Sequence, residues 1–186
     1  SIQAMDVDEI ISAILVREGG FVDDPADHGG ATNRGVTLPT LGEYLGRPAT
    51  VEDLKALTEV DAKRLYRELY VVRPGFGIIG SQALLGLLVD MAVNHGVSRA
   101  IKLLQRAVGV NDDGVFGPLT KQAVMQADFN RLYRRLIAER VRFYGRIITE
   151  DYKRLVLAGV LKPEHRSQAR FAAGWLNRAA EFVERS

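Results

Sequence analysis

Glu18 and the loop that follows it hold the side chains of this chain that are best suited to acid–base chemistry. Glu18 ends an apolar stretch that contains Ile14 and Leu15, and Gly19 and Gly20 follow it directly. A carboxyl group at the C-terminal end of a helix faces the negative end of the helix dipole, and apolar neighbours exclude water, so both disfavour its ionised form. A carboxyl group that stays protonated near neutral pH can serve as a general acid. The alternative interpretation is a solvated glutamate at a helix end.

Three aspartates and a threonine follow this glutamate within the same loop. Asp23, Asp24 and Asp27 crowd a short acidic stretch, and Thr32 lies beyond them. The stretch fails the EF-hand pattern, because the glycine and the glutamate that complete such a loop are missing. We therefore expect no metal site, since a lone His28 also lacks suitably spaced ligands. What remains is an acid near a second carboxylate and a hydroxyl, a set that can hold a water for hydrolysis of a glycosidic bond.

Helical spacing of apolar residues surrounds this loop and predicts a mainly α protein. Asp6 or Asp8 is expected to cap the first helix, and Gly19-Gly20 to end it. Residues 19–36 then form a long loop with room for a short hairpin, and a loop of this length inside a compact domain is usually functional. Further helices are expected over 37–45, 51–57, 59–70, 82–94, 98–108, 129–149, 150–158 and 164–184, with another opening at Pro118.

Particular residues predict where some of these helices begin. Thr50 with Asp53, and Thr58 with Asp61, have the spacing of N-terminal capping boxes. Ser81 precedes the most apolar helix, which we expect to be the central buried one.

Composition and charge exclude some kinds of site and divide the chain into unlike halves. With no cysteine among its 186 residues, the chain has no disulfide, thiolate nucleophile or iron–sulfur cluster. Residues 1–95 hold 8 Lys/Arg and 14 Asp/Glu, a net charge of −6, whereas residues 96–186 hold 17 and 9, a net charge of +8. Within the second half, residues 131–154 form a basic helix. It is interpreted either as a solvated face or as a surface for an anionic polymer or membrane.

No segment is apolar enough to cross a bilayer. The longest apolar run near the middle, Ala83–Val89, is far shorter than the roughly 20 residues that a spanning helix needs. The first residues also lack the basic and then apolar pattern of a signal peptide. We therefore expect that the protein is not directed across the membrane by a signal peptide of its own.

The acidic loop belongs to a longer pattern that points to one family. It reads Glu18-Gly19-Gly20-Phe21-x-x-Asp24-Pro25-x-Asp27-x-Gly29-Gly30-x-Thr32-Asn33-x-Gly35-Val36-Thr37. This pattern resembles the signature of glycoside hydrolase family 108, which consists of bacterial and phage N-acetylmuramidases with a lysozyme-like fold. The resemblance continues through Leu65-Tyr66-Arg67-x-x-Tyr70 and Asp90-x-Ala92-Val93-Asn94-x-Gly96.

The second half resembles the C-terminal peptidoglycan-binding region of the same family. The residues that carry this likeness are Leu104-Gln105-x-Ala107-x-Gly109-Val110, Asp113-Gly114-Val115-Phe116-Gly117-Pro118-x-Thr120 and Gly174-Trp175-Leu176-x-Arg178. By spacing alone, the segment from Asp113 to Thr120 is a tight turn that opens a helix. Trp175 lies at helical spacing from other apolar residues, which favours core packing over a sugar-stacking platform.

The resemblance implies roles for residues of the acidic loop. Glu18 is the general acid, and Asp27 with Thr32 positions the attacking water, with Asp23 and Asp24 as alternatives. Glu18, Asp27 and Thr32 together also resemble the Glu–Asp–Thr triad of other phage lysozymes. Only four residues separate Asp27 from Thr32, however, whereas five separate the aspartate from the threonine in that triad.

Substrate contacts are expected from a second set of residues, Asp24, Asn33, Asn94 and His95. Asn94 stands at the end of the expected buried helix and is able to reach acetamido or hydroxyl groups of a sugar. The alternative is an ordinary residue at a helix end.

The activity that the resemblance implies is hydrolysis of the β-1,4 bond between N-acetylmuramic acid and N-acetylglucosamine, in an endolysin that lyses bacteria. A lytic transglycosylase, which uses one acid and no water, is one alternative. A non-catalytic peptidoglycan-binding module is another. Nucleic acid is not expected as a partner, because the first half is acidic and no reading helix is recognisable. Whether the reaction inverts or retains configuration stays open.

The resemblance also implies how the chain is organised. Residues 5–95 are expected to form the lysozyme-like catalytic region, and residues 96–186 a helical peptidoglycan-binding region packed on the same compact body. The expected partners are peptidoglycan and, through residues 131–154, an anionic envelope surface. No cofactor is expected, and the protein is expected to be a monomer. It would be made in the host cytoplasm and reach the cell wall through a separate membrane-permeabilising partner.

Overall fold

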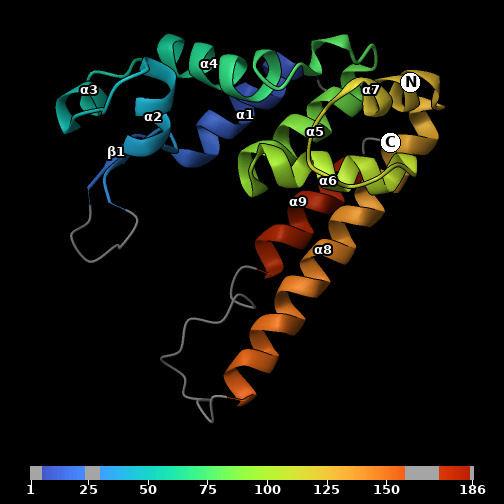
Figure 1. The fold of residues 1–186 in the computed structure, drawn as a ribbon. Coiled ribbons are helices and arrows are strands. Elements are labelled where there is room, and N and C mark those ends of the chain that lie inside the picture. Colours follow the sequence, from blue (N-terminus) through green and yellow to red (C-terminus); the bar gives the residue numbers. More distant parts are fainter. Residues whose placement is uncertain (1–5, 24–29, 158–171, 185–186) are drawn as a thin grey trace. The chain divides into compact units, whose positions relative to one another are not determined.

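The computed structural model describes residues 6–23, 30–157 and 172–184, and within them the chain is mainly helical (Figure 1). A small antiparallel sheet follows the first helix. The mainly α class with a hairpin early in the chain, expected from the sequence, is therefore confirmed. The packing divides the chain into two compact units, Met5–Ser98 and Arg99–Ser186.

The first unit arranges short helices and the small sheet around one buried helix. Its elements are α1 (Val7–Glu18), β1 (Phe21–Val22), β2 (Thr32–Asn33), β3 (Val36–Thr37), α2 (Leu38–Leu45), α3 (Val51–Lys55), α4 (Glu59–Arg67), a π-helix η1 (Glu68–Val72), a 3₁₀-helix η2 (Phe76–Ile78) and α5 (Gln82–His95). Every residue of α5 from Leu84 to Ala92 is buried, and α1 and η1 pack on this helix. The central buried helix expected from the sequence is thus α5.

Side-chain caps explain where several of these helices begin. Asp6 caps α1 and forms a reciprocal capping box with Glu9. The two capping boxes expected at Thr50 and Thr58 are both present. Each box satisfies backbone N–H groups that the first helical turn leaves without partners, so these helix starts are local properties of the sequence.

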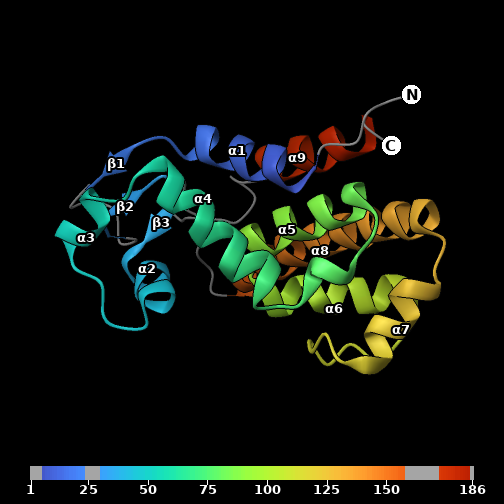
Figure 2. The ribbon, with the colours of Figure 1, turned by 90° about the horizontal axis from the view of Figure 1, so that it is seen from above.

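The small sheet follows the C-terminal end of α1 in the chain (Figure 2). Its strand order is β1-β2-β3, with Phe21 opposite Asn33 and Asn33 opposite Val36. Arg34 and Gly35 connect β2 to β3, and their φ angles are +54° and +76°. A two-residue turn with both φ angles positive is the type I′ turn that suits the twist of a hairpin.

The second unit consists of helices alone in the part that the structure describes. These are α6 (Val97–Val108), which starts at the end of the first unit, α7 (Pro118–Gln126), α8 (Phe129–Leu157) and α9 (Ala172–Glu184). Helix α9 packs along α8, and Trp175 of α9 stacks on the buried Tyr144 of α8 with ring centroids 5.1 Å apart. Trp175 therefore packs within the unit, as its spacing indicated.

Several helix boundaries differ from those expected, among them that of the helix expected over 51–57, which ends at Lys55. The predicted break near residue 149 is wrong, because α8 runs unbroken to Leu157. No glycine or proline follows Gly145 in this helix, and the i, i+3 ion pairs Lys153–Glu150 and Arg154–Asp151 join its last turns. The helix expected over 59–70 changes to a π-helix at Glu68. The predicted start of the last helix at residue 164 lies outside the described residues.

None of the helices that the structure describes is long and apolar enough to span a membrane.

Candidate active site

Glu18 is the last residue of α1, and its exposed side chain lies where that helix ends. Gly19, with φ +72°, turns the chain out of the helix immediately after it. The end of α1 is tied to the core by Arg17, whose Nη2 lies 3.6 Å from Oδ1 of the fully buried Asp90 on α5. This ion pair and the packing of α1 on α5 fix the backbone that carries Glu18.

Gly35 of the β2–β3 turn lies directly against the stem of Glu18. A Cβ atom at this glycine would come within 2.6 Å of Cγ and 2.9 Å of Cβ of Glu18, and within 2.9 Å of the Tyr66 hydroxyl. Real Cβ atoms do not approach other atoms this closely. The positive φ of Gly35 also disfavours any L side chain. Only glycine lets the turn meet the acid so closely.

Tyr66 of α4 holds the β2–β3 turn beside Glu18. Its side chain is buried, and its hydroxyl donates a hydrogen bond to the Arg34 carbonyl oxygen at 3.1 Å. Burial raises the pKa of the Tyr66 hydroxyl above its ordinary value, and the nearby Tyr70 and Glu18 raise it further. Tyr66 therefore stays neutral at physiological pH and continues to donate to the turn. The ring stacks on Tyr70 with centroids 5.6 Å apart. We call Glu18, Arg34, Gly35 and Tyr66 the Glu18 cradle.

The Glu18 cradle combines an anchored stem with an open carboxyl group. The stem packs against a turn that a buried tyrosine holds, while the Glu18 side chain as a whole remains exposed. Such a carboxyl group can reach a bond in a large external substrate without a change in the backbone. A carboxyl group placed in this way can donate a proton to a leaving oxygen.

The partners expected for Glu18 are only partly described. Asp24 and Asp27 lie outside the described residues, and Asp23 is exposed at the end of β1. Thr32 is half-buried in β2, opposite Val22 and Thr37, and no hydrogen bond joins it to Glu18 among the residues that the structure describes. Within the same residues, no group of three or more His, Asp or Glu side chains is arranged to hold a metal ion.

Two of the residues expected to contact substrate, Asn33 and Asn94, form hydrogen bonds within the protein. Asn33 is buried, and its amide nitrogen donates to the Leu54 carbonyl oxygen at 2.8 Å, which ties β2 to the end of α3. The amide nitrogen of Asn94 donates to the Asp90 carbonyl oxygen at 2.6 Å, one turn earlier in α5. His95 is half-buried at the last position of that helix.

Gly35 and Tyr66 stand within the motifs of the sequence, but neither was expected to have a role in the site. The i, i+4 spacing of Tyr66 and Tyr70 on a helix was the available signal, because it places two aromatic rings on one face. The contact between Gly35 and Glu18 has no local signal, since it joins a turn to a helix across the intervening loop.

In the second unit, the segment from Asp113 to Thr120 is held by one buried glutamine. Nε2 of Gln105 lies 2.8 Å from Oδ1 of Asp113, and 3.0 Å from both the Val115 carbonyl oxygen and Oγ1 of Thr120. The backbone N–H of Gly114 donates to Oε1 of Gln105 at 2.9 Å. We call this segment the Gln105 turn. Its internal hydrogen bonds agree with the interpretation of the motif as a turn that opens α7.

Comparisons with known proteins agree with this geometry. Residues 11–96 match the family described as "Glycosyl hydrolase 108", and residues 99–180 match the one described as "Predicted Peptidoglycan domain". Among solved structures, the chain is similar to "Structure of Brucella abortus SagA" with a TM-score of 0.72 and 32% identity, over 95% of this chain and 91% of that one. A search of curated protein sequences finds no match.

Proposed function

Since this chain belongs to the glycosyl hydrolase 108 family and carries a peptidoglycan domain after the hydrolase domain, we propose that it is an N-acetylmuramidase. A glycosidase of this family that acts on peptidoglycan works at the cell wall. The bond that we propose it cleaves is the β-1,4 bond between N-acetylmuramic acid and N-acetylglucosamine. The first unit would cut the glycan, and the second would hold the polymer.

In the proposed reaction, Glu18 donates its proton to the glycosidic oxygen as the bond to the anomeric carbon breaks. A water then attacks the anomeric carbon of the oxocarbenium-like centre, and its proton passes to a carboxylate. We propose Asp27 and Thr32 as the residues that hold this water, with Asp23 and Asp24 as the alternative holders. Asp24, Asn94 and His95 are proposed to contact the sugars, and Asn33 to act by holding β2 in place.

The observation that carries this proposal is the Glu18 cradle. A general acid must stay at a fixed distance from the leaving oxygen, because a displacement of about 1 Å can cost roughly a hundredfold in rate. The close approach of Gly35 and the Tyr66 hydrogen bond restrict the Glu18 stem. The exposure of its side chain leaves the carboxyl group open to a polymer.

Mass spectrometry of purified murein digested by the wild type and by Glu18→Gln tests the proposal. We expect the wild type to release fragments with reducing N-acetylmuramic acid ends, and Glu18→Gln to release almost none. Glu52→Gln, which alters an exposed glutamate on α3, is the matched control and should behave as the wild type.

Other products would identify other activities. Fragments ending in 1,6-anhydro-muramic acid would indicate a lytic transglycosylase instead of a hydrolase. Binding of murein without any release would indicate a non-catalytic module. Reducing N-acetylglucosamine ends would show that the other glycosidic bond is cut.

We further propose that the activity serves bacterial lysis, in the manner of an endolysin that is made in the cytoplasm and reaches the wall through a membrane-permeabilising partner. Expression inside bacteria, with and without such a partner, tests this role. Lysis that needs the partner supports it.

A further inference from the structure

The basic residues of α8 fall into distinct groups once their contacts are known. Arg140 is fully buried, donates from Nε to the Tyr144 hydroxyl at 2.7 Å and lies over the Phe182 ring. It therefore belongs to the packing of α8 against α9. The basic helix is thus not one uniformly charged face.

Three further basic residues are neutralised within the helix. Arg142 pairs with Glu139 at 2.6 Å, and both Lys153 and Arg154 pair with acidic residues one turn earlier. The remaining arginines are exposed, and their guanidinium groups form no ion pair or hydrogen bond with another residue that the structure describes. These are Arg131, Arg134, Arg135 and Arg146.

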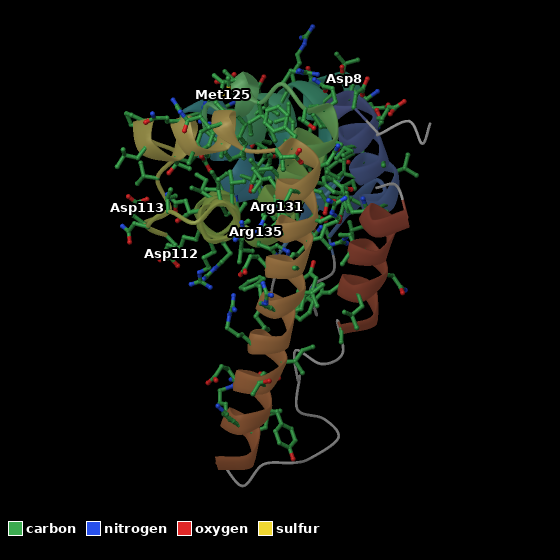
Figure 3. All side chains as sticks on the ribbon, turned by 90° about the vertical axis from the view of Figure 1, so that its right-hand side faces the viewer. Asp8, Asp112, Asp113, Met125, Arg131 and Arg135 are labelled. Atoms are coloured by element: carbon green, nitrogen blue, oxygen red, sulfur yellow. The ribbon has the colours of Figure 1, made fainter. Side chains whose placement is uncertain are left out.

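Two of these four arginines, Arg131 and Arg135, line a cavity. A cavity of about 220 Å³ lies where the end of α6 meets the start of α8. Its walls are Ala107, Val108, Ala127, Asp128, Arg131, Leu132 and Arg135. Arg131 and Arg135 are one helical turn apart, so their side chains share a face of α8 (Figure 3). We call this cavity the Arg131–Arg135 pocket.

The pocket combines cationic groups with an apolar wall. Ala107, Val108, Ala127 and Leu132 supply the apolar part. Asp128 also lines the pocket, and its Oδ1 accepts the backbone N–H of Arg131 at 2.7 Å, so this carboxylate caps α8. Guanidinium groups bind carboxylates through two parallel hydrogen bonds, and such pairs are stronger than neutral ones.

We propose that the Arg131–Arg135 pocket binds a carboxylate of the peptide stems of peptidoglycan. Peptidoglycan is the polymer supported for this chain by its C-terminal domain. Its stem peptides bear free carboxylates beside short aliphatic side chains, which match the charge and the apolar wall of the pocket. This inference rests on that substrate class and not on the role of Glu18.

Sedimentation with murein sacculi tests the assignment. All proteins carry Glu18→Gln, so that binding is measured without cleavage, and cleavage is assayed separately. Arg131→Gln/Arg135→Gln should weaken binding by about tenfold or more, the effect expected when charge-assisted hydrogen bonds are lost. The matched control Arg134→Gln/Arg146→Gln removes the same charge from the same helix outside the pocket, and should bind within about twofold of the parent.

Two further measurements separate recognition from general attraction. Arg131→Lys/Arg135→Lys keeps the charge but removes the guanidinium fork, and it should also lose most of the binding. Sacculi whose carboxyl groups have been converted to amides provide the second measurement. The parent protein, which carries only Glu18→Gln, should bind them as weakly as Arg131→Gln/Arg135→Gln binds untreated sacculi.

Several results would overturn the proposal. One is an equal loss of binding in the control pair, which would indicate an unspecific charged surface. Another is unchanged binding to amidated sacculi. A third is stronger, pocket-dependent binding to phosphatidylglycerol vesicles than to sacculi, which would assign the pocket to a lipid surface.

Discussion

The Glu18 cradle in the first unit and the Gln105 turn in the second share one feature: in each, a single buried side chain holds a turn in place. In the cradle, a single hydrogen bond from Tyr66 reaches the turn, and the turn has positive φ angles at Arg34 and Gly35. In the Gln105 turn, one glutamine bonds to backbone and side-chain groups at both ends of the segment, from Asp113 to Val115 and at Thr120.

The difference between them distinguishes a candidate catalytic site from a turn with a structural role. The cradle keeps an arginine in a left-handed conformation, which is uncommon and costs about 1–2 kcal/mol, and it leaves the Glu18 side chain exposed. In the Gln105 turn, the Gly114 N–H, the Val115 carbonyl oxygen and the Thr120 hydroxyl bond to the buried Gln105 side chain. We infer that its motif shapes the peptidoglycan-binding unit, and that contact with the polymer occurs elsewhere, at the Arg131–Arg135 pocket.

Gln105→Leu should have the largest effect on stability. It leaves the buried Thr120 and the backbone of the turn without their partner, and each such group costs roughly 1–3 kcal/mol. We expect the free energy of unfolding to fall by about 3 kcal/mol in chemical denaturation. The exposed Gln122 of α7 provides the control, and Gln122→Leu should change it little. Equal stability of the two variants would show that the glutamine does not hold the turn.

Gly35→Ala should affect activity more than stability. The new Cβ meets the Glu18 stem and the Tyr66 hydroxyl, so the acid must move. We expect a tenfold to hundredfold loss of murein hydrolysis, on the order of the cost of a misplaced group, with about 1–2 kcal/mol of destabilisation. Gly20→Ala is the control, since nothing lies within 4 Å of a Cβ at that position. Full activity of Gly35→Ala would argue against the cradle.

Tyr66→Phe should have a smaller effect on the same site. It removes the hydrogen bond to the Arg34 carbonyl oxygen but keeps the ring that stacks on Tyr70. We expect about 1 kcal/mol of destabilisation and a loss of activity of a few fold. Tyr70→Phe also keeps the stacked pair and should retain activity. If both variants behave alike in a steady-state assay, the Tyr66 hydroxyl has no positioning role.

Asp113→Asn should have the smallest effect, visible only in acid. Hydrogen bonds from the Gln105 side chain and the Val115 backbone hold the pKa of Asp113 below its ordinary value of 3.8. The ionised carboxylate therefore stabilises the fold above that pH, and this stability is lost as the pH falls through the lower pKa of the folded state. Asparagine retains the acceptor oxygen without the charge. Thermal unfolding below pH 4 should show a shallower pH dependence for Asp113→Asn, whereas parallel curves would contradict this origin.

Local features of this chain were predictable because neighbouring residues determine them. The capping boxes at Thr50 and Thr58, and the cap of α1 at Asp6, one of the two aspartates expected there, depend on residues three positions apart, and these helices begin at them. The end of α1 at Gly19 is also determined locally, because glycine readily adopts the positive φ angle found there. Glu18 was found as a candidate acid for this reason, since its neighbours in sequence fix its place on the helix.

Contacts between distant segments were not predictable in the same way. Tyr66 reaches a turn 32 residues away, and no spacing rule indicates that pairing. Arg140 was grouped with the charged surface because arginine is usually exposed. Its helical register with Leu136, Ile137 and Tyr144, which are all buried, was the signal that it faces α9.

The role of Glu18 as the acid is tested by measuring bound and released murein in the same samples, for the wild type, Glu18→Gln and Glu52→Gln. General acid catalysis typically contributes about 10²–10⁴-fold in rate. We predict that Glu18→Gln binds sacculi as tightly as the wild type and releases reducing ends at least a hundredfold more slowly, while Glu52→Gln matches the wild type in both. Release by Glu18→Gln at a rate near that of the wild type would contradict the assignment of Glu18 as the acid.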